Sequence, residues 1–224
     1  MKQIPNFITL CNLLAGSLSI YAATQGNMLW AAYFIFFGAI ADFFDGLVAR
    51  AMGVSSPVGA QLDSLSDLVS FGLAPAFIAL HFFQDALQFQ FLAFLIPLCA
   101  AIRLARFNVG KGGDETYFYG LPSPACGMFW AFTAIGGIHF LPQEMQSIYV
   151  GLCILGTALL MVVPLRILSF KLKSLSWRAN ASRYLFLILA LIIIPFAGWA
   201  SPPIILVLYL FCSIADKYYS PKAL

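Results

Sequence analysis

The stretch 41–72 reads "ADFFDGLVARAMGVSSPVGAQLDSLSDLVSFG" and carries four aspartates, Asp42, Asp45, Asp63 and Asp67. Residues three or four apart lie on one face of a helix, so Asp42 and Asp45 share one face and Asp63 and Asp67 share another. A short loop, "AMGVSSP", joins the two segments, which are therefore expected to pack as antiparallel neighbours. The four carboxylates can then converge in one polar pocket, about one to three helical turns below a surface.

Four converging carboxylates in an apolar setting imply a bound cation, because like charges at low dielectric must be neutralised by protons or by a metal. Oxygen ligands without His or Cys favour a hard divalent ion such as Mg²⁺, Mn²⁺ or Ca²⁺ over zinc. A pair of such ions held by aspartates is the usual apparatus for displacement at phosphorus. Arg50, at the mouth of the expected pocket, suits a phosphate anchor, and Gly46 and Gly59 allow a flat group to approach the backbone. The spacing predicts a metal-dependent site for a phosphorylated substrate that resides in the membrane.

Two other interpretations of these aspartates stay open on the residues alone. An intramembrane aspartate can be half of a structural pair, and a set of aspartates can line the path of a transported cation. Transport is less well supported, because all four aspartates cluster on one adjacent helix pair near one surface. Beyond them, no charged residue crosses the expected membrane midplane to continue a path.

The composition of the chain is that of an integral membrane protein. Of its 224 residues, 62% are hydrophobic and 9% are charged, and the mean hydropathy is +0.91. A soluble domain has about 25% charged residues. The Lys and Arg residues lie in short loops rather than in a patch, so no nucleic-acid partner is expected. We expect a single membrane domain over residues 1–224.

Apolar segments of about the length that a bilayer requires occur eight times along the chain. They cover residues 6–23, 28–49, 58–82, 89–107, 122–139, 148–165, 184–200 and 203–214. This pattern predicts an all-α polytopic membrane protein with about eight transmembrane helices and an active site between the second and third. The catalytic core would cover about 1–165, and residues 184–217 would form a C-terminal helical hairpin.

The distribution of basic residues predicts the orientation in the membrane. All twelve Lys and Arg residues fall at alternate ends of the expected helices, and the opposite ends carry Asp85, Glu144, His81 and His139. The positive-inside rule then places both termini in the cytoplasm, which requires an even number of spans. The predicted location is the cell membrane, multi-pass, with the aspartate site facing the cytoplasm.

The aspartate stretch resembles the signature of the CDP-alcohol phosphotransferases. Residues 42–67 match D-x2-D-G-x2-A-R-x8-G-x3-D-x3-D at every fixed position. The resemblance implies two ions, Mg²⁺ or Mn²⁺, among the four aspartates, with Asp67 also the base for the acceptor hydroxyl. It implies that the CDP-lipid is bound by Asn6, Thr9, Gly46, Ala49, Arg50, Ser56 and Gly59, the first two from the similar opening "PNFIT". Without the resemblance, Asn6 and Thr9 read equally well as residues at the start of a helix.

Three stretches indicate which acceptor alcohol to expect. "QLDSLSDLVSFGLAPA", "RLARFNV" and "YFYGLPSPA" resemble the CDP-diacylglycerol–serine O-phosphatidyltransferases, over roughly the first 125 residues. The resemblance implies that the phosphatidyl group of CDP-diacylglycerol, a membrane lipid, passes to L-serine and gives phosphatidylserine and CMP. It also implies a homodimer.

A serine acceptor needs cationic partners for its carboxylate, which guanidinium binds in a bidentate manner. The candidate acceptor contacts are Arg103, Arg106, Asn108 and Lys111, at the cytoplasmic end of the fourth expected span. Positive-inside anchoring and contact with lipid headgroups explain the same basic residues equally well. An anionic acceptor such as glycerol 3-phosphate would need the same cations, so that acceptor, or an inositol compound, stays open.

Overall fold

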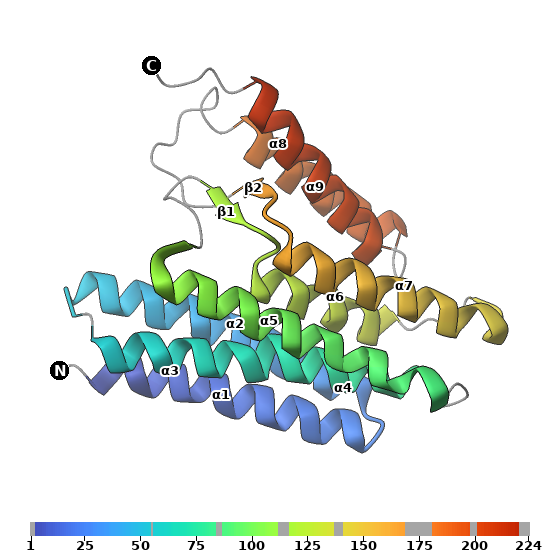
Figure 1. The fold of residues 1–224 in the computed structure, drawn as a ribbon, viewed down its shortest axis with the longest axis horizontal. Helices are drawn as coiled ribbons and strands as arrows, with labels where there is room; N and C mark the ends of the chain where they lie inside the picture. Colours follow the sequence, from blue (N-terminus) through green and yellow to red (C-terminus); the bar gives the residue numbers. More distant parts are fainter. Residues whose placement is uncertain are drawn as a thin grey trace.

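The computed structural model describes residues 3–54, 56–83, 87–111, 117–136, 141–168, 181–197 and 201–219. Within these ranges the chain forms eight helical segments and a short two-stranded ribbon (Figure 1). The segments are α1 (Gln3–Thr24), α2 (Met28–Ala51), α3–η1–α4 (Pro57–Leu68, Val69–Leu73, Ala74–His81), η2–α5–η3 (Leu87–Phe94, Leu95–Arg106, Phe107–Lys111), α6 (Ser123–Gly136), α7 (Gln143–Val162), α8 (Ala181–Ala197) and α9 (Ser201–Tyr219). Each expected apolar segment corresponds to one of these helical segments, so the prediction of an all-helical membrane protein is confirmed.

Helices α1 and α2 form a close pair that brings the N-terminal polar residues beside the aspartate stretch. Both helices bury small residues, among them Ala22 and Ala31, and small residues let two backbones approach closely. Gly26, with a φ of +74°, makes the turn between the helices, a conformation that glycine adopts without strain. The Asn27 side chain then caps α2 by accepting a hydrogen bond from the Trp30 N–H (3.3 Å).

The third segment carries two of the aspartates and changes its winding directly after them. Ser56 caps α3 by accepting a hydrogen bond from the Gly59 N–H (2.9 Å), and Pro57 occupies the first turn, where its missing N–H is not needed. The wider π-turn η1 begins two residues after Asp67 and leads into α4 without a break. Single π-turns inside α-helices are frequent at functional sites.

Helix α1 lies directly against η1, and two contacts fix this packing. The Ser70 hydroxyl donates a hydrogen bond to the Asn12 carbonyl (2.8 Å). Gly16 has no room for a side chain, because an added Cβ would lie 2.6 Å from the Ser70 Cα. The close approach places the Asn12 side chain within reach of the aspartate-bearing helix.

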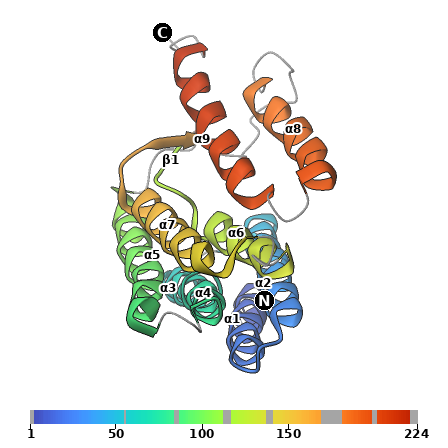
Figure 2. The same ribbon diagram turned by 90° about the vertical axis from the view of Figure 1, so that its right-hand side faces the viewer.

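The remaining bundle helices surround α3–α4. In Figure 2, α3–α4 lies between α1 and α5, and α6 lies between α2 and α7. Large side chains fill the space between these helices, including Phe71, Trp130, Ile154 and Met161, all buried. This core packs η1, which follows Asp67 in the chain, against α5 and α6, and α1, α5 and α6 supply the groups around Asp67.

A short ribbon and two C-terminal helices complete the described structure (Figure 1). Strand β1 (Tyr117–Tyr119) pairs antiparallel with β2 (Arg166–Leu168), a feature that the helical patterns of the sequence do not predict. Gly120, with a φ of +78°, follows β1 at a point where an added Cβ would meet the Met161 carbonyl. Helices α8 and α9 pack on each other, and α9 contacts α6 and β2.

Five of the eight segments are long and apolar enough to cross a membrane, namely Gln3–Thr24, Met28–Ala51, Pro57–His81, Phe89–Gly110 and Met145–Val162. The apolar parts of α8 and α9 are shorter, and α6 has 14 residues. At 1.5 Å per residue α6 is about 21 Å long, less than the hydrocarbon core of about 30 Å. A polytopic membrane protein follows, whereas the number of eight spans and the cytoplasmic termini stay predictions.

Candidate active site

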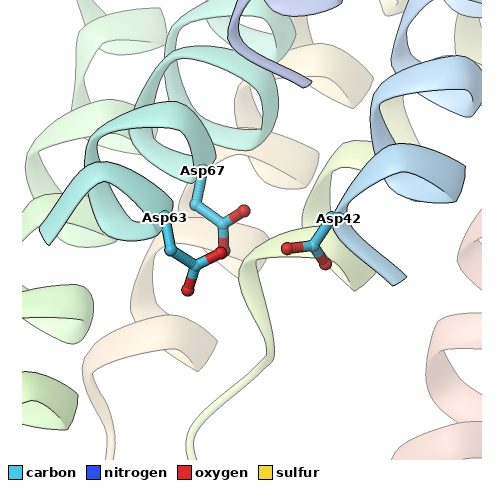
Figure 3. A group of neighbouring side chains, drawn as sticks. All are labelled: Asp42, Asp63 and Asp67. Carbon is cyan, nitrogen blue, oxygen red and sulfur yellow. The ribbon is translucent and has the colours of Figure 1, made fainter. Parts of the chain in front are cut away.

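Three of the four aspartates meet between α2 and α3 (Figure 3). Asp42 extends from α2, and Asp63 and Asp67 extend from α3, one turn apart. One carboxylate oxygen of each residue lies within 4.8 Å of the other two. Asp67 is buried, whereas Asp42 and Asp63 are half-buried. The predicted convergence of carboxylates from two neighbouring helices is thus present for these three.

Asp45 lies beside this group rather than within it. The residue stands about one turn from Asp42 on α2, is only 5% exposed, and lines the same cavity as Asp42 and Asp63. Its Oδ2 atom is buried without a hydrogen-bond partner among the described residues. A buried carboxylate oxygen that lacks a partner is costly. A cation or a donor group of a ligand fits this atom.

The first cavity, of about 310 Å³, opens between α1, α2 and the start of α3. Its wall is formed by Pro5, Asn6, Thr9, Asp42, Asp45, Gly46, Ala49, Val54, Ser56, Gly59, Ala60 and Asp63. Small and polar residues therefore surround three carboxylates. The volume is at the lower end of the range of about 300–1,000 Å³ that is typical of ligand sites.

Six of the seven predicted CDP-lipid contacts line this first cavity, namely Asn6, Thr9, Gly46, Ala49, Ser56 and Gly59. A Cβ added at Gly46 would meet no atom within 4 Å, so the backbone there faces open space. A Cβ added at Gly59 would lie 3.0 Å from Ser56 Oγ and 3.1 Å from Asn6 Oδ1. The seventh residue, Arg50, is exposed at the end of α2 and is not part of the cavity wall.

Asp67 is hydrogen-bonded through both carboxylate oxygens. Asn12 of α1 donates from Nδ2 to Asp67 Oδ1 (3.4 Å), and the Ser123 hydroxyl of α6 donates to Asp67 Oδ2 (3.1 Å). Arg103 of α5 in turn donates from a guanidinium nitrogen to Ser123 Oγ (3.0 Å). Three helices besides α3 therefore contribute to the surroundings of one carboxylate.

Sequence reasoning missed two of these residues, Asn12 and Ser123. Asn12 continues the polar series of Asn6 and Thr9 along α1 in steps of three, which places all three near one helix face. That spacing is a signal that could have identified Asn12. Ser123 lies in "YFYGLPSPA", where nothing in the pattern distinguishes it from any other residue at the start of a helix.

Two of the candidate acceptor contacts line a second cavity, of about 270 Å³. Its wall is formed by Arg103, Arg106, Phe107, Tyr119, Met161, Val162 and Pro164. Arg106 also donates a hydrogen bond to the Val162 carbonyl (2.8 Å) at the end of α7. The Nε atom of Arg103 is buried, and within the described ranges it has no hydrogen-bond partner.

The other two candidate acceptor contacts lie elsewhere. The Asn108 amide donates to Gln61 Oε1 (3.4 Å), and its carbonyl oxygen accepts from the Ser64 hydroxyl (3.1 Å). Asn108 thus connects η3 to α3 and is not part of either cavity wall. Lys111 ends η3, and its side chain lies outside the described residues.

The donor set of the aspartate group fits a hard divalent cation. Three carboxylates offer oxygens within 4.8 Å of one another, and Asp45, whose Oδ2 has no partner in the described part of the chain, lies in the adjoining wall. Carboxylate oxygens without nitrogen or sulfur ligands suit Mg²⁺, Mn²⁺ or Ca²⁺.

Comparison with protein families shows the family of this chain. The model of the family described as CDP-alcohol phosphatidyltransferase matches residues 2–215. The chain belongs to this family. The resemblance of the aspartate motif is thereby confirmed, and the protein is a membrane transferase of this class. Enzymes of the family are in general metal-dependent, in agreement with the acidic cluster.

Three individual relatives show which enzymes of the family are similar to this chain. The chain is 38% identical over 130 residues to a CDP-diacylglycerol–serine O-phosphatidyltransferase of Bacillus subtilis (strain 168), covering 57% of this chain and 73% of that protein. It is 29% identical over 197 residues to the enzyme of the same name from Helicobacter pylori (strain J99), covering 85% and 81%. An archaetidylserine synthase of Methanothermobacter thermautotrophicus is 36% identical over 127 residues, covering 54% of this chain and 53% of the relative.

Proposed function

We propose that this protein is a CDP-diacylglycerol–serine O-phosphatidyltransferase of the cell membrane. It transfers the phosphatidyl group of CDP-diacylglycerol to the hydroxyl of L-serine, which gives phosphatidylserine and CMP. The observation that carries the proposal is the meeting of Asp42, Asp63 and Asp67 beside a cavity lined by the family motif. The acceptor is inferred from the relatives, whose printed names specify serine.

The first cavity binds the CDP headgroup of the lipid. Asn6, Thr9 and Ser56 offer hydrogen-bonding groups on its wall, and Gly46 and Ala49 leave room for a flat or bulky group. The Ser56 oxygen already accepts from the Gly59 N–H, so the hydroxyl proton of Ser56 is available to a phosphate oxygen. Arg50, exposed at the end of the same helix, approaches the diphosphate from outside the cavity wall.

The aspartates hold the metal that the family requires. Asp42, Asp45, Asp63 and Asp67 would bind two ions, Mg²⁺ or Mn²⁺, and Asp45 would contribute its Oδ2, which has no partner among the residues that the structure describes. When bound, such ions neutralise the diphosphate and stabilise the leaving phosphate oxygen. Without them, the carboxylates would repel the phosphates of the substrate.

Asp67 acts as the general base. Its carboxylate takes the proton of the serine hydroxyl, and the hydroxyl oxygen then attacks the lipid-bearing phosphorus directly. The bond from that phosphorus to the CMP oxygen breaks, and CMP leaves with the bonding electrons. Asn12 and Ser123 each donate to Asp67, so in these two hydrogen bonds the carboxylate is an acceptor, as a base must be.

The second cavity binds the carboxylate of the acceptor. Arg103 and Arg106 contribute guanidinium groups to its wall, and the Arg103 Nε–H, which has no partner among the described residues, can donate to that carboxylate. Arg103 is separated from Asp67 by two hydrogen bonds of 3.0 and 3.1 Å through Ser123. The proposal therefore requires the carboxylate of serine to contact Arg103 while its hydroxyl reaches Asp67. Asn108 and Lys111 stay predicted acceptor contacts.

The membrane arrangement follows from the distribution of basic residues. The aspartate site faces the cytoplasm, where CMP is released, and CDP-diacylglycerol enters from the inner leaflet. We also propose that the protein forms a homodimer, as the family resemblance implies.

A panel of acceptors tests the proposed reaction. Purified protein in vesicles that contain CDP-diacylglycerol and Mg²⁺ or Mn²⁺ is supplied in turn with radiolabelled L-serine, glycerol 3-phosphate or an inositol phosphate. We expect label in lipid, and CMP in equal amount, with serine alone. Label from another acceptor would move the proposal to that acceptor. Divalent-ion flux into sealed vesicles without CMP release would replace it with cation transport.

A further inference from the structure

We infer that Asn12 and Ser123 are positioning residues that hold the Asp67 carboxylate from both sides, and that Arg103 directs the Ser123 hydroxyl toward it. The inference rests on the proposed role of Asp67 as base. Neither Asn12 nor Ser123 belongs to the aspartate motif, and neither lines the wall of either cavity. Their contribution is to the geometry of the residue that touches the acceptor.

The direction of each hydrogen bond around Ser123 is fixed by chemistry. Guanidinium has only donors, so Arg103 must donate to Ser123 Oγ over their 3.0 Å contact. The single hydroxyl proton of Ser123 is then free to point at Asp67 Oδ2, 3.1 Å away. Ser123 and Asp67 are both buried, so water does not compete for these bonds. Arg103 thus selects the one rotamer of the hydroxyl that orients Asp67.

Asn12 holds the opposite oxygen of the carboxylate. Its Nδ2 donates to Asp67 Oδ1 over 3.4 Å, and a carboxylate can accept only from the amide nitrogen. The Asn12 backbone is fixed by the hydrogen bond that its carbonyl accepts from Ser70. Its side-chain oxygen lies against α2, where a Cβ added at Gly38 would come within 2.9 Å of Oδ1. Backbone and side chain of Asn12 are therefore both constrained.

The hydrogen bonds to both carboxylate oxygens of Asp67 have a direct consequence for the reaction. Asp63 lies one turn from Asp67 on the same helix face and lines the first cavity. Asp67, in contrast, is fixed by hydrogen-bond donors from α1 and α6. A base must keep its oxygen within hydrogen-bond reach of the reacting hydroxyl, and misplacement by about 1 Å can cost about 10²-fold in rate. Removal of either donor should therefore slow turnover without changing how the CDP-lipid binds.

Steady-state kinetics of three variants in CDP-diacylglycerol vesicles test this role. We expect Ser123→Ala to lower kcat by about 10-fold to 100-fold, the range typical of groups that orient a ligating carboxylate, and to leave the KM for CDP-diacylglycerol within about twofold. Ser123→Thr keeps the hydroxyl and should recover most of the loss. Asn12→Leu, similar in size but without a donor, should lower kcat in the same way.

Thr133→Val provides the matched control, because it removes another buried hydroxyl from α6. The Thr133 hydroxyl donates to the Phe129 carbonyl (2.9 Å) within the helix and does not contact Asp67. This variant should keep the wild-type kcat. Equilibrium binding of CDP-diacylglycerol to every variant shows that the site has folded.

Two results would overturn the inference. One is a kcat of Ser123→Ala and Asn12→Leu within twofold of wild type, and the other is a loss of CDP-diacylglycerol binding that parallels the loss of kcat. If the proposed function is wrong, the result is a different one, because the wild-type protein then uses another acceptor in place of serine. The same kcat comparison with that acceptor would still decide the role of Ser123 and Asn12.

Discussion

The two cavities of this protein are built in opposite ways. The first combines α1, α2 and α3, and its chemistry comes from carboxylates that lie within one continuous stretch of the chain, residues 42–67. The second combines α5, β1 and the end of α7, and its chemistry comes from two guanidinium groups, Arg103 and Arg106. A local motif forms the anionic site that suits metal and diphosphate, whereas distant segments form the cationic site that suits an acceptor carboxylate.

On the proposed assignment, this difference would let one fold keep its reaction while its acceptor varies. The carboxylates depend on the spacing of residues along two adjacent helices, so few changes are tolerated there. The second cavity depends on the packing of distant elements, so on the proposed assignment we expect single substitutions in it to alter which acceptor binds. The hydrogen bonds from Arg103 through Ser123 to Asp67 connect the two sites.

Metal removal is expected to have the largest effect. It tests the anionic site without acting on the cationic one. Excess chelator should reduce CMP release to background, because carboxylates without a cation repel the diphosphate. Added Mg²⁺ or Mn²⁺ should restore it. Asp63→Asn, which removes one charge from the group, should raise the Mg²⁺ concentration needed for half-maximal release. Full activity in excess chelator would show that the aspartates serve another purpose.

Asp67→Asn is expected to have the next largest effect. The amide cannot take the proton of serine, so kcat should fall by about 10²-fold to 10⁴-fold, the usual contribution of a general base. Binding of CDP-diacylglycerol should stay measurable by equilibrium titration. Asp216→Asn in α9, outside both cavity walls, serves as the control. Wild-type kcat in Asp67→Asn would assign the base to another residue.

A smaller effect is expected at the edge of the first cavity, where Ser56 caps α3. Ser56→Ala removes the acceptor for the Gly59 N–H and should lower the free energy of unfolding by about 1 kcal/mol. For a chain of this length that corresponds to a fall of about 2–4 °C in Tm. Ser56→Thr should keep the cap and the wild-type Tm. An unchanged Tm in Ser56→Ala would mean that the cap does not stabilise α3.

Much of the first cavity could be predicted from the sequence because its signal is local. Helical spacing placed Asp42 beside Asp63 and Asp67, and the family resemblance selected six CDP-lipid contacts that do line the cavity. The eight apolar stretches likewise predicted the helical segments. Local periodicity carries this information because hydrophobic burial and helical geometry act over a few residues.

The rest depends on packing between distant segments. The motif places Asp45 three residues after Asp42 on α2, but which of these two carboxylates meets Asp63 and Asp67 depends on how α2 packs against α3. The bond from Ser123 to Asp67 joins residues 56 positions apart, and the β1–β2 ribbon joins segments that each span only three residues. Such short strands have no periodicity to detect. Arg50, expected at the mouth of the pocket, is exposed at the end of α2 and is not part of the cavity wall.

Two variants, each assayed with the concentrations of both substrates varied, test most directly whether each cavity binds one substrate. Gly46→Val projects a side chain into the open space of the first cavity, and Arg106→Gln removes a charge from the second. We predict that Gly46→Val raises the KM for CDP-diacylglycerol alone. Arg106→Gln should raise the KM for serine alone, by about 10-fold or more, as expected for loss of a charged hydrogen bond. Both variants raising the KM of the same substrate would contradict the assignment.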